Sequence, residues 1–512
     1  MTLRTVKPGH YLAYGSNDFL GAGAMSVISG WILFFYTTFC GLTAVQAAAI
    51  FATARVIDAV ASPLIGFASD HFNRTWLGRR FGRRRFFILA SIPLLPSFAL
   101  MWVDGQTFWY YLITYVFFEV VYAMELIPYE TLAAEMSPDY KVKAKFAGAR
   151  ILCGQIAAIL AGVLPGRIIE AFGKNSAQTF FWLGVIFSVI FMFVALMVYL
   201  FSWERTPSRA ENLALADAQA SRASLSDNMQ RLYSDLWSTL KIRAFRLHLG
   251  MYLGGYISQD IFNAVFTYFV VFAVSGTVVV ASNLLGGMAF AQLVAVALFI
   301  PMCLKFHPAP SYRVAVSLYA LGVLGFVALY LLVPGEAVAW LFVPVIVAGL
   351  GRGGLNYIPW NTYNYMADVD EIVTGRRREG AFAGVMTFVR KTTQAAAVML
   401  VGLILQMGGF VSSSTVQTGA AVSTIVLIMA LGTLTVLALG FIVSLRFKLD
   451  RHTHAILTEE VQRFKDGSVT EAPLAHRQIV EDLSGWPYEQ LWGRNPVAQG
   501  RAAAAVRERP AT

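Results

Sequence analysis

Residues 54–85 read ARVIDAVASPLIGFASDHFNRTWLGRRFGRRR, and this stretch decides the class of fold. Asp58 lies within a long apolar run, and arginines occupy five of the seven positions from Arg79 to Arg85. A carboxylate inside a membrane-length helix is costly unless it faces a polar cavity or has a partner. Arginines clustered after an apolar run mark the cytoplasmic side of a bilayer. The stretch therefore predicts a membrane helix that contains a functional acid and is followed by a basic cytoplasmic loop.

The composition of the whole chain also indicates an integral membrane protein. Of its 512 residues 57% are hydrophobic and 14% are charged, whereas soluble proteins average about 25% charged residues. The first residues lack a secretory signal with its cleavage site. Three widely spaced cysteines indicate neither a disulfide framework nor a metal site. The net charge of +10 lies mostly in loops beside apolar runs, so we expect contact with the lipid bilayer and no nucleic-acid partner.

Apolar runs of membrane length recur along the chain, since a spanning helix needs about 20 mostly apolar residues. Twelve spans are predicted at residues 11–39, 44–71, 86–104, 107–135, 147–172, 177–202, 241–273, 277–303, 312–333, 338–367, 380–408 and 417–445. An even number of spans places both termini on one side. Arginines and lysines are concentrated in the loops of that side, which predicts a cytoplasmic location for both termini.

The spans fall into two groups of six. We predict an N-terminal six-helix bundle over residues 1–202, a cytoplasmic linker over 203–240, a C-terminal six-helix bundle over 241–446 and a cytoplasmic tail over 447–512. This all-α layout resembles that of the major facilitator superfamily, in which two halves enclose a central site. The linker is expected to contain an amphipathic helix, the tail segment of residues 450–467 to be helical, and the last residues, 501–512, to be disordered. We assign no function to these three segments and expect them to be solvated connectors. We expect a multi-pass protein of the inner or plasma membrane that works as a monomer.

The second predicted span contains the main candidate for a functional centre. Arg55, Asp58 and Ser62 are spaced so that they share one face of a helix. Pro63 and Gly66 follow and permit a kink or a close helix contact. Two interpretations stay open: Asp58 faces a cavity and senses a cation, or Arg55 neutralises it in a purely structural role.

Other charged residues lie within the fourth, fifth and seventh predicted spans. In the fourth span Glu125 is the candidate cavity acid. Glu119 and Glu130 could simply pair with bases on neighbouring helices. Arg150 lies near the start of the fifth span, where its side chain could simply reach the water at the membrane surface. Asp260 of the seventh span either pairs with a base or contacts a substrate.

The tenth predicted span places Arg352 near the membrane centre among the glycines of residues 349–354. A buried guanidinium without a partner is prohibitive, so we expect it to meet an acid of the second, fourth or seventh span, or an anionic substrate. Trp360 and Tyr365 follow on the same span and could stack on a sugar ring. Packing is the more common role for aromatic residues in membrane helices.

The loop after the tenth span reads MADVDEIVTGRRREG from residue 366 to residue 380. Its acids and bases suggest a cytoplasmic gate that holds the two halves together in one state and releases them in another. The residues of this predicted gate are Asp368, Asp370, Glu371, Arg376, Arg377 and Arg378. Lys391 follows in the eleventh span, deep enough to reach the cavity acids.

Four stretches resemble the glycoside–pentoside–hexuronide:cation symporters, the melibiose-permease-like branch of the major facilitator superfamily. They are residues 33–70, 79–89 (RRFGRRRFFIL), 127–150 (IPYETLAAEMSPDYKVKAKFAGAR) and 368–391 (DVDEIVTGRRREGAFAGVMTFVRK). The resemblance implies cation-coupled uptake of sugars by alternating access. It implies that Asp58 binds the cation, that Glu125 and Arg150 bind sugar, and that Lys391 neutralises the acids between cycles.

The chain departs from the pattern of the sodium-using members at four positions. Ser62 replaces the second carboxylate of the second span, and Ala22 replaces an acid of the first span, although Asp18 is one turn away. Glu130 replaces the sugar-stacking tryptophan, and Tyr365 replaces an acid of the tenth span. A single acid near a base suits a proton better than sodium, because its pKa can change with its partners. We expect the coupling ion to be H⁺ rather than Na⁺, with no other cofactor and no bound metal.

The resemblance therefore implies a secondary active transporter that imports a sugar, a glycoside or a related polar solute. Asp58 would exchange the proton, with Lys391 or Arg55 as its alternate partner. We expect no enzyme, because the sequence has no nucleophile–His–acid set, no metal-ligand spacing and no Walker loop. Two alternatives stay open: a carrier of a lysolipid-like or other anionic solute, and a non-transporting membrane assembly factor or sensor.

Overall fold

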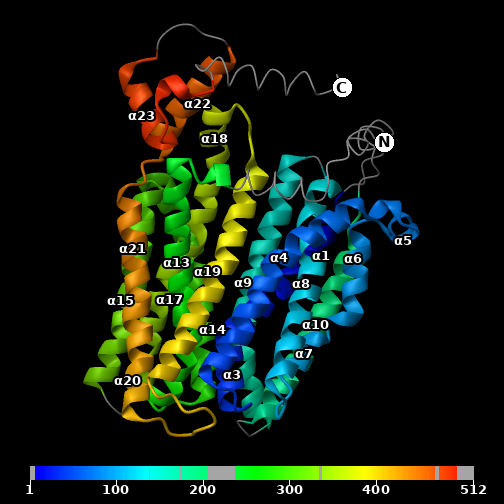
Figure 1. The fold of residues 1–512 in the computed structure, drawn as a ribbon, viewed down its shortest axis with the longest axis vertical. Helices are drawn as coiled ribbons and strands as arrows, with labels where there is room; N and C mark the ends of the chain where they lie inside the picture. The colour runs from blue at the N-terminus through cyan, green and yellow to red at the C-terminus, as the bar shows by residue number, and fades with distance from the viewer. Residues whose placement is uncertain are drawn as a thin grey trace.

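The computed structural model describes residues 6–137, 139–172, 176–204, 237–333, 337–466 and 472–492. These residues are almost entirely helical, as Figure 1 shows. The predicted amphipathic helix of the linker and the final segment 501–512 lie outside the described residues. Eleven of the described helices are long and apolar enough to cross a membrane, and a shorter apolar helix covers the remaining predicted span. The all-α membrane class predicted from the sequence is confirmed.

The first half begins with a span from Pro8 to Thr38 in which α-helical and π-helical turns alternate. Its elements are α1 (Pro8–Gly15), η1 (Phe19–Gly23), α2 (Ala24–Val27), η2 (Ile28–Ile32) and α3 (Leu33–Thr38). The other long helices of this half are α4 (Ala44–His71), α8 (Phe108–Met136), α9 (Tyr140–Phe172) and α10 (Ala177–Phe201). Because π-helical turns in long helices are frequent at functional sites, these turns indicate that the first span contributes to a functional site.

The third span differs from its prediction as one continuous helix over residues 86–104. It consists of α6 (Arg85–Ser91), η4 (Ile92–Leu94) and α7 (Ser97–Leu100). Pro93 and Pro96 lack the backbone N–H that a continuous α-helix needs, so the chain passes through a tight turn between α6 and α7. The loop before it contains η3 (Phe72–Arg74) and α5 (Trp76–Phe81).

The second half repeats the plan of long helices. Its elements are α13 (Arg243–Tyr268), η5 (Phe269–Ala273), α14 (Val278–Phe306), α15 (Pro308–Leu332), α16 (Ala337–Trp340), α17 (Phe342–Tyr363), α18 (Met366–Thr374), α19 (Glu379–Met407), α20 (Gly419–Leu427), η6 (Ile428–Gly432) and α21 (Thr433–Leu445). The tail adds α22 (Arg451–Lys465), α23 (Leu474–Ser484) and η7 (Tyr488–Gln490). A helix was expected in the tail, and α22 confirms it.

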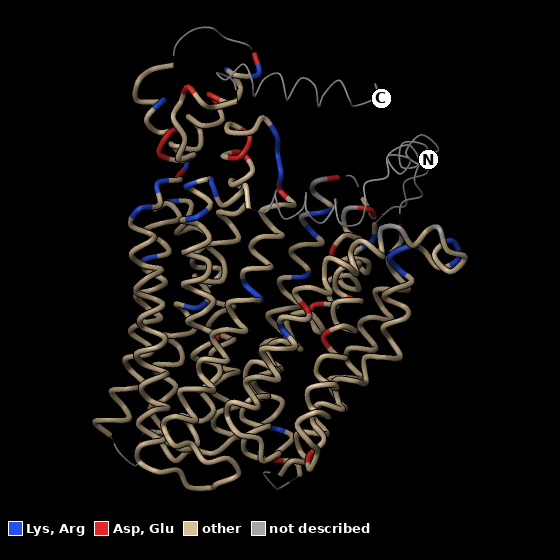
Figure 2. Tube along the Cα trace, viewed as in Figure 1, with Lys and Arg blue, Asp and Glu red and all other residues tan. Residues whose placement is uncertain are grey.

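The two ends of the helix bundle differ in charge. The end at which α1 begins and α22 and α23 lie, called here the termini side, carries most of the lysines and arginines (Figure 2). At the opposite end threonines begin the helices α4, α8, α14 and α20. Each side-chain oxygen accepts a hydrogen bond from the third residue of its helix, which satisfies a backbone N–H that the helix leaves free; the capping residues are Thr43, Thr107, Thr277 and Thr418.

The halves touch through two pairs of long helices, α4 with α19 and α9 with α14. Small residues allow these contacts. A Cβ atom on Gly162 of α9 would lie 2.5 Å from the backbone nitrogen of Gly286 on α14, and one on Gly402 of α19 would overlap Ala48 of α4. Membrane helices approach closely where such small residues meet, because backbone packing replaces the hydrophobic effect there.

Polar contacts reinforce the closure at the end opposite the termini side. The hydroxyls of Thr37 and Tyr268 are 2.6 Å apart, and the backbone N–H of Ser413 donates to the Thr37 carbonyl at 2.9 Å. The Ser282 hydroxyl donates to the Gly162 carbonyl at 2.5 Å. The described hydrogen bonds and ion pairs between the halves therefore run from this end to the middle of the bundle, where α4 meets α19.

Substituting Gly162 by alanine tests the close contact between α9 and α14. The added methyl group meets backbone that cannot move aside cheaply, so Gly162→Ala is expected to destabilise the protein by about 1–3 kcal/mol and to lower its unfolding temperature by several degrees. Gly148→Ala on the same helix is the matched control, since nothing lies within 4 Å of its Cβ position and alanine favours helix. Thermal unfolding in detergent measures both; equal unfolding temperatures for the two variants would contradict the packing described.

Candidate functional site

An ion pair joins the two halves in the middle of the bundle. Asp58 on α4 is fully buried, and the Lys391 ammonium of α19 lies 2.8 Å from its Oδ2 atom. The same ammonium donates to the Ser62 hydroxyl at 2.8 Å, and that hydroxyl donates to Asp58 Oδ1 at 3.0 Å. Asp58 and Ser62 are one helical turn apart on α4, so both face α19. A lysine of one half thus closes a polar triad whose other members belong to the other half.

Arg55 extends this triad into a network of four charges. Its Nη1 atom lies 3.4 Å from Asp58 Oδ2 and 3.4 Å from Glu119 Oε2 on α8. Two carboxylates, Asp58 and Glu119, therefore share two cations, Arg55 and Lys391. Glu119, for which the sequence predicted only pairing with a neighbouring base, pairs with Arg55. Its Oε1 atom is buried and makes no hydrogen bond with a described residue.

A second cluster of acids lies within the first half. The Arg150 guanidinium of α9 donates from Nε to Asp18 Oδ2 at 2.8 Å, and its Nη2 lies 3.5 Å from Glu130 Oε1. Glu125 is fully buried and accepts a hydrogen bond from the Asn17 amide at 3.1 Å. The sequence predicted Glu125 and Arg150 for this place. It noted Asp18 only as a neighbour of the missing acid and did not find Asn17, although the two residues precede the first π-helical turn.

Asp260 on α13 is neutralised by a base of the same half. Arg390 on α19 donates to both of its carboxylate oxygens, at 2.6 and 2.8 Å, and the Gln394 amide donates at 3.1 Å. Of the two roles left open for Asp260, pairing with a base is the one present in this structure. Sequence reasoning gave no role to Arg390, whose partner is 130 positions away along the chain.

Arg352 on α17 does not meet the acid that was expected. It is 6% exposed, its Nε donates to Gln259 Oε1 at 3.2 Å, and its Nη1 donates to Asn263 Oδ1 at 2.9 Å. The expected acids have other partners, described above. The two amide oxygens come from α13, four residues apart, so that one helix face presents both to the guanidinium. The expectation of an acid partner is wrong, and amide dipoles take its place.

Arg352 also lines a cavity of about 100 Å³ between the halves. Helix elements of both halves contribute to its wall: the first span, α9, α13, α14 and α17. Its polar lining consists of Ser26, Ser29, Asn263, Gln292 and Arg352. The sequence identified only the arginine in this set. Within the described residues no group of three or more His, Cys, Asp or Glu side chains is arranged to hold a metal ion.

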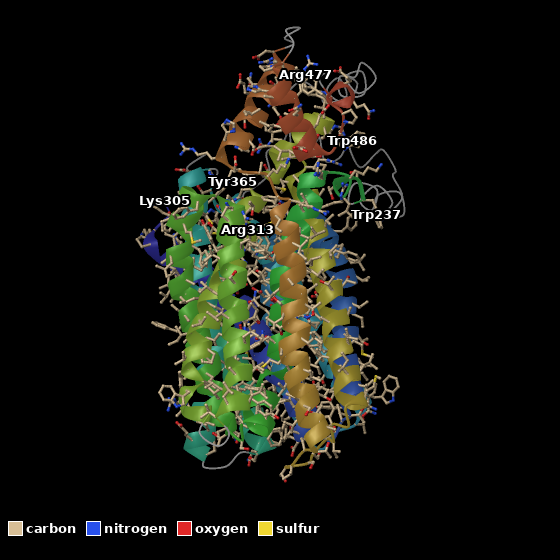
Figure 3. All side chains as sticks on the ribbon, turned by 90° about the vertical axis from the view of Figure 1, so that its left-hand side faces the viewer. Trp237, Lys305, Arg313, Tyr365, Arg477 and Trp486 are labelled. Carbon is tan, nitrogen blue, oxygen red and sulfur yellow. The ribbon has the colours of Figure 1, made fainter. Side chains whose placement is uncertain are left out.

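Trp360 and Tyr365 do not belong to this cavity. They follow Arg352 by eight and thirteen residues, which places them about 12 and 20 Å along the helix direction. Trp360 is 45% exposed and donates to the Tyr256 hydroxyl at 3.1 Å. Tyr365 packs its ring against His454 of α22, and Figure 3 shows it at the end of the bundle that faces the tail helices. Stacking of either ring on a solute beside Arg352 is therefore not supported.

The predicted gate residues lie on and just after α18, and their described ion pairs stay within the second half and the tail. Arg378 pairs with Asp370 at 2.6 Å and Arg377 with Asp368 at 2.7 Å. Glu371 pairs with Lys465 of α22 at 2.7 Å. Arg376 makes no side-chain ion pair with a described residue.

The predicted latch between the two halves is therefore not formed by the ion pairs of the described residues. The tail, expected to be a solvated connector, instead packs on the gate: His454 lies 2.8 Å from Asp368, and the backbone N–H of Trp492 donates to the Ile372 carbonyl at 3.3 Å. A further anchor is Asp482 of α23. The hydrogen bond from Lys448, with the charges of Lys448 and Arg243, holds the pKa of that carboxyl below its ordinary value.

Comparisons with known proteins agree with this architecture. The family model described as MFS/sugar transport protein matches residues 13–451. The glucuronide carrier protein homolog of Escherichia coli (strain K12) is 24% identical over 495 residues, which cover 93% of this chain and 97% of the relative. The isoprimeverose transporter of Lactiplantibacillus pentosus is 23% identical, covering 78% and 80%. A crystal structure of a D-xylose-proton symporter matches with a TM-score of 0.55 at 14% identity, covering 84% and 96%, and shows a shared fold.

The Asp260–Arg390 pair provides a test of the charge arrangement. Asp260→Asn leaves a largely buried guanidinium without its carboxylate, and breaking a buried pair in this way costs about 3–5 kcal/mol. We expect a clear drop in the unfolding temperature of the purified protein, with partial recovery in the double variant Asp260→Asn, Arg390→Gln. Glu170→Gln is the control, because it breaks the exposed Arg167–Glu170 pair and should change little. An unchanged unfolding temperature for Asp260→Asn would refute the assignment.

Proposed function

Because the chain belongs to the MFS/sugar transport protein family, we propose that it is a proton-coupled symporter of a sugar or glycoside that works by alternating access. It is an integral, multi-pass membrane transporter and not an enzyme. The class of solute, the coupling ion and the side of the membrane on which each end of the bundle lies are proposed here.

The ion pair between Asp58 and Lys391 is the observation that carries the proposal. It joins the halves at a fully buried carboxylate, where a movement of the halves changes the number of charges in contact. With Lys391 in place, Asp58 and Glu119 balance Arg55 and Lys391, and the formal sum of the network is zero. When Lys391 withdraws, one negative charge is left in a site of low dielectric constant, and binding of one cation restores the balance.

The oxygen atoms around Asp58 favour a proton as that cation. A sodium ion needs several oxygen ligands, and α4 supplies one carboxylate and the Ser62 hydroxyl. A proton needs a single carboxylate oxygen, and its affinity follows directly from the departure and return of a neighbouring ammonium group. Asp58 would therefore take up the proton when Lys391 leaves and release it when Lys391 returns.

The distribution of charge and contacts supports an orientation. Lysines and arginines gather on the termini side, which supports a cytoplasmic location for that side. The polar and small-residue contacts between the halves lie at the opposite, external end. A bundle held together externally corresponds to the state that receives or releases solute on the cytoplasmic side.

Support for a sugar or glycoside comes from the relatives and from the cluster around Arg150. A glucuronide carrier protein homolog and an isoprimeverose transporter match most of this chain. The cluster contributes guanidinium donors and the carboxylate acceptors of Asp18, Glu125 and Glu130. Alternating donors and acceptors suit a ring that carries several hydroxyl groups.

Asp58→Asn tests the coupling. The amide cannot exchange a proton, so uptake driven by an imposed pH gradient into proteoliposomes is expected to fall at least tenfold, while counterflow, which needs no driving ion, continues. A panel of labelled glycosides and uronates supplies the solutes. Ser62→Ala is the matched control: a protonated carboxylate tolerates loss of this hydroxyl, whereas a sodium site would not.

Two results would contradict the proposed coupling. Uptake that still follows the pH gradient in Asp58→Asn would remove Asp58 from the coupling mechanism. Accumulation driven by a sodium gradient at constant pH, lost in Ser62→Ala, would replace the proton by sodium.

A further inference from the structure

Two arginines are buried in the described part of the chain, and they differ in their partners. Arg55 lies between Asp58 and Glu119. Arg352 makes no ion pair with a described residue, although it is as deeply buried. A buried guanidinium without an opposite charge carries a large desolvation cost that amide dipoles offset only in part. The imbalance at Arg352 therefore needs an explanation.

Neighbouring acids do not supply the missing charge. Asp260 on the adjacent helix already receives hydrogen bonds from Arg390 on both oxygens and from Gln394 on one of them. The cavity beside Arg352 has no aspartate or glutamate in its lining. The negative charge that would balance this guanidinium is thus absent from the walls of the cavity.

The surroundings of Arg352 hold its guanidinium at the wall of the cavity. Its Nε and Nη1 atoms are used by Gln259 and Asn263, and the rings of Phe262 and Tyr319 lie 5.7 and 5.8 Å from its central carbon. Its Nη2 atom donates no hydrogen bond to a described residue. The Nη2 side of the guanidinium is therefore available to a ligand, while the Nε and Nη1 side is held in place.

A chain of amides adds a second donor to the same cavity. The Gln259 amide donates to Asn356 Oδ1 at 3.0 Å, and the Asn356 amide donates to Gln292 Oε1 at 3.0 Å. The carbonyl oxygen of Gln292 is occupied in this way, so its NH₂ group is the part left for the cavity that Gln292 lines. Arg352 and Gln292 thus leave N–H donors for the cavity, whereas the hydroxyls of Ser26 and Ser29 already donate to backbone carbonyls.

From this arrangement we infer that the cavity between the halves is an anion subsite, in which Arg352 and Gln292 bind a carboxylate or sulfonate of the transported solute. The inference rests on the proposed function and names the solute class: a sugar derivative with one acidic group. A cavity of about 100 Å³ has room for such a group. The acids around Arg150 would repel an anion, which directs the acidic group to Arg352.

Binding of a matched pair of probes tests the subsite. Methyl β-D-glucuronide and methyl β-D-glucoside share a ring and differ in one carboxylate, and titration calorimetry on the purified full-length protein measures the affinity for each. The wild type is expected to bind the glucuronide at least tenfold more tightly, the effect of one hydrogen bond to a charged group. Arg352→Gln should abolish this preference and leave the affinity for the glucoside within twofold.

Two further variants separate charge from folding. Arg352→Lys keeps a cation at the cavity and should retain part of the preference for the anion. Arg246→Gln removes an exposed arginine of α13 whose described hydrogen bonds go to backbone carbonyls, and it should leave both affinities unchanged.

The outcomes distinguish this inference from the proposed function. A wild type that binds the glucuronide no better than the glucoside, or an Arg352→Gln variant that keeps the preference, overturns the anion subsite. Counterflow of each probe in proteoliposomes measures transport independently of the binding experiment. Transport of the glucoside alone leaves the symporter intact and removes the subsite; an Arg352-dependent preference in binding without counterflow of either probe supports the subsite and overturns the symporter.

Discussion

The rest of the structure depends on the contact between the Lys391 ammonium and the Asp58 carboxylate, because among the described residues it is the one ion pair that crosses between the halves. Burying either charge alone would be prohibitive, so each half depends on the other for compensation at this level. Arg55 and Glu119 adjust the balance from within the first half. In the proposed mechanism, a network that is neutral only while the halves touch would link their separation to the uptake of a cation.

The packing around this pair makes such a separation possible at low cost. At the end opposite the termini side the halves meet through glycines and a few hydroxyl contacts, as between Gly162, Gly286 and Ser282. Contacts of this kind depend on close fit and have little apolar area of their own, since lipid solvates apolar side chains equally well. The tail contributes a different constraint, because α22 and α23 hold α18 and its gate acids in the second half.

The sequence predicted what depends on local order and missed what depends on distant contacts. Apolar length and periodicity locate the spans, and i, i+3 and i, i+4 spacing places Arg55, Asp58 and Ser62 on one face. Pro93 and Pro96 were visible, but a count of apolar residues does not register their effect on the helix. The partners of Arg352 and Asp260 lie 93 and 130 positions away, so neither spacing nor composition could distinguish an acid from an amide. Packing of the tail on α18 was invisible for the same reason.

The separation of charges between the halves has an electrical consequence. The first half contributes Asp58, which would bind the proton, and the second half contributes Arg352, which would bind the anion. If one proton and one solute anion move together, no net charge crosses the membrane in the loaded step. The membrane potential, worth about 2.3 kcal/mol per elementary charge per 100 mV, then does no work on that step, and the pH gradient alone drives accumulation. A neutral sugar on the same carrier would instead move with one positive charge, so the arginine that selects the solute would also select its driving force.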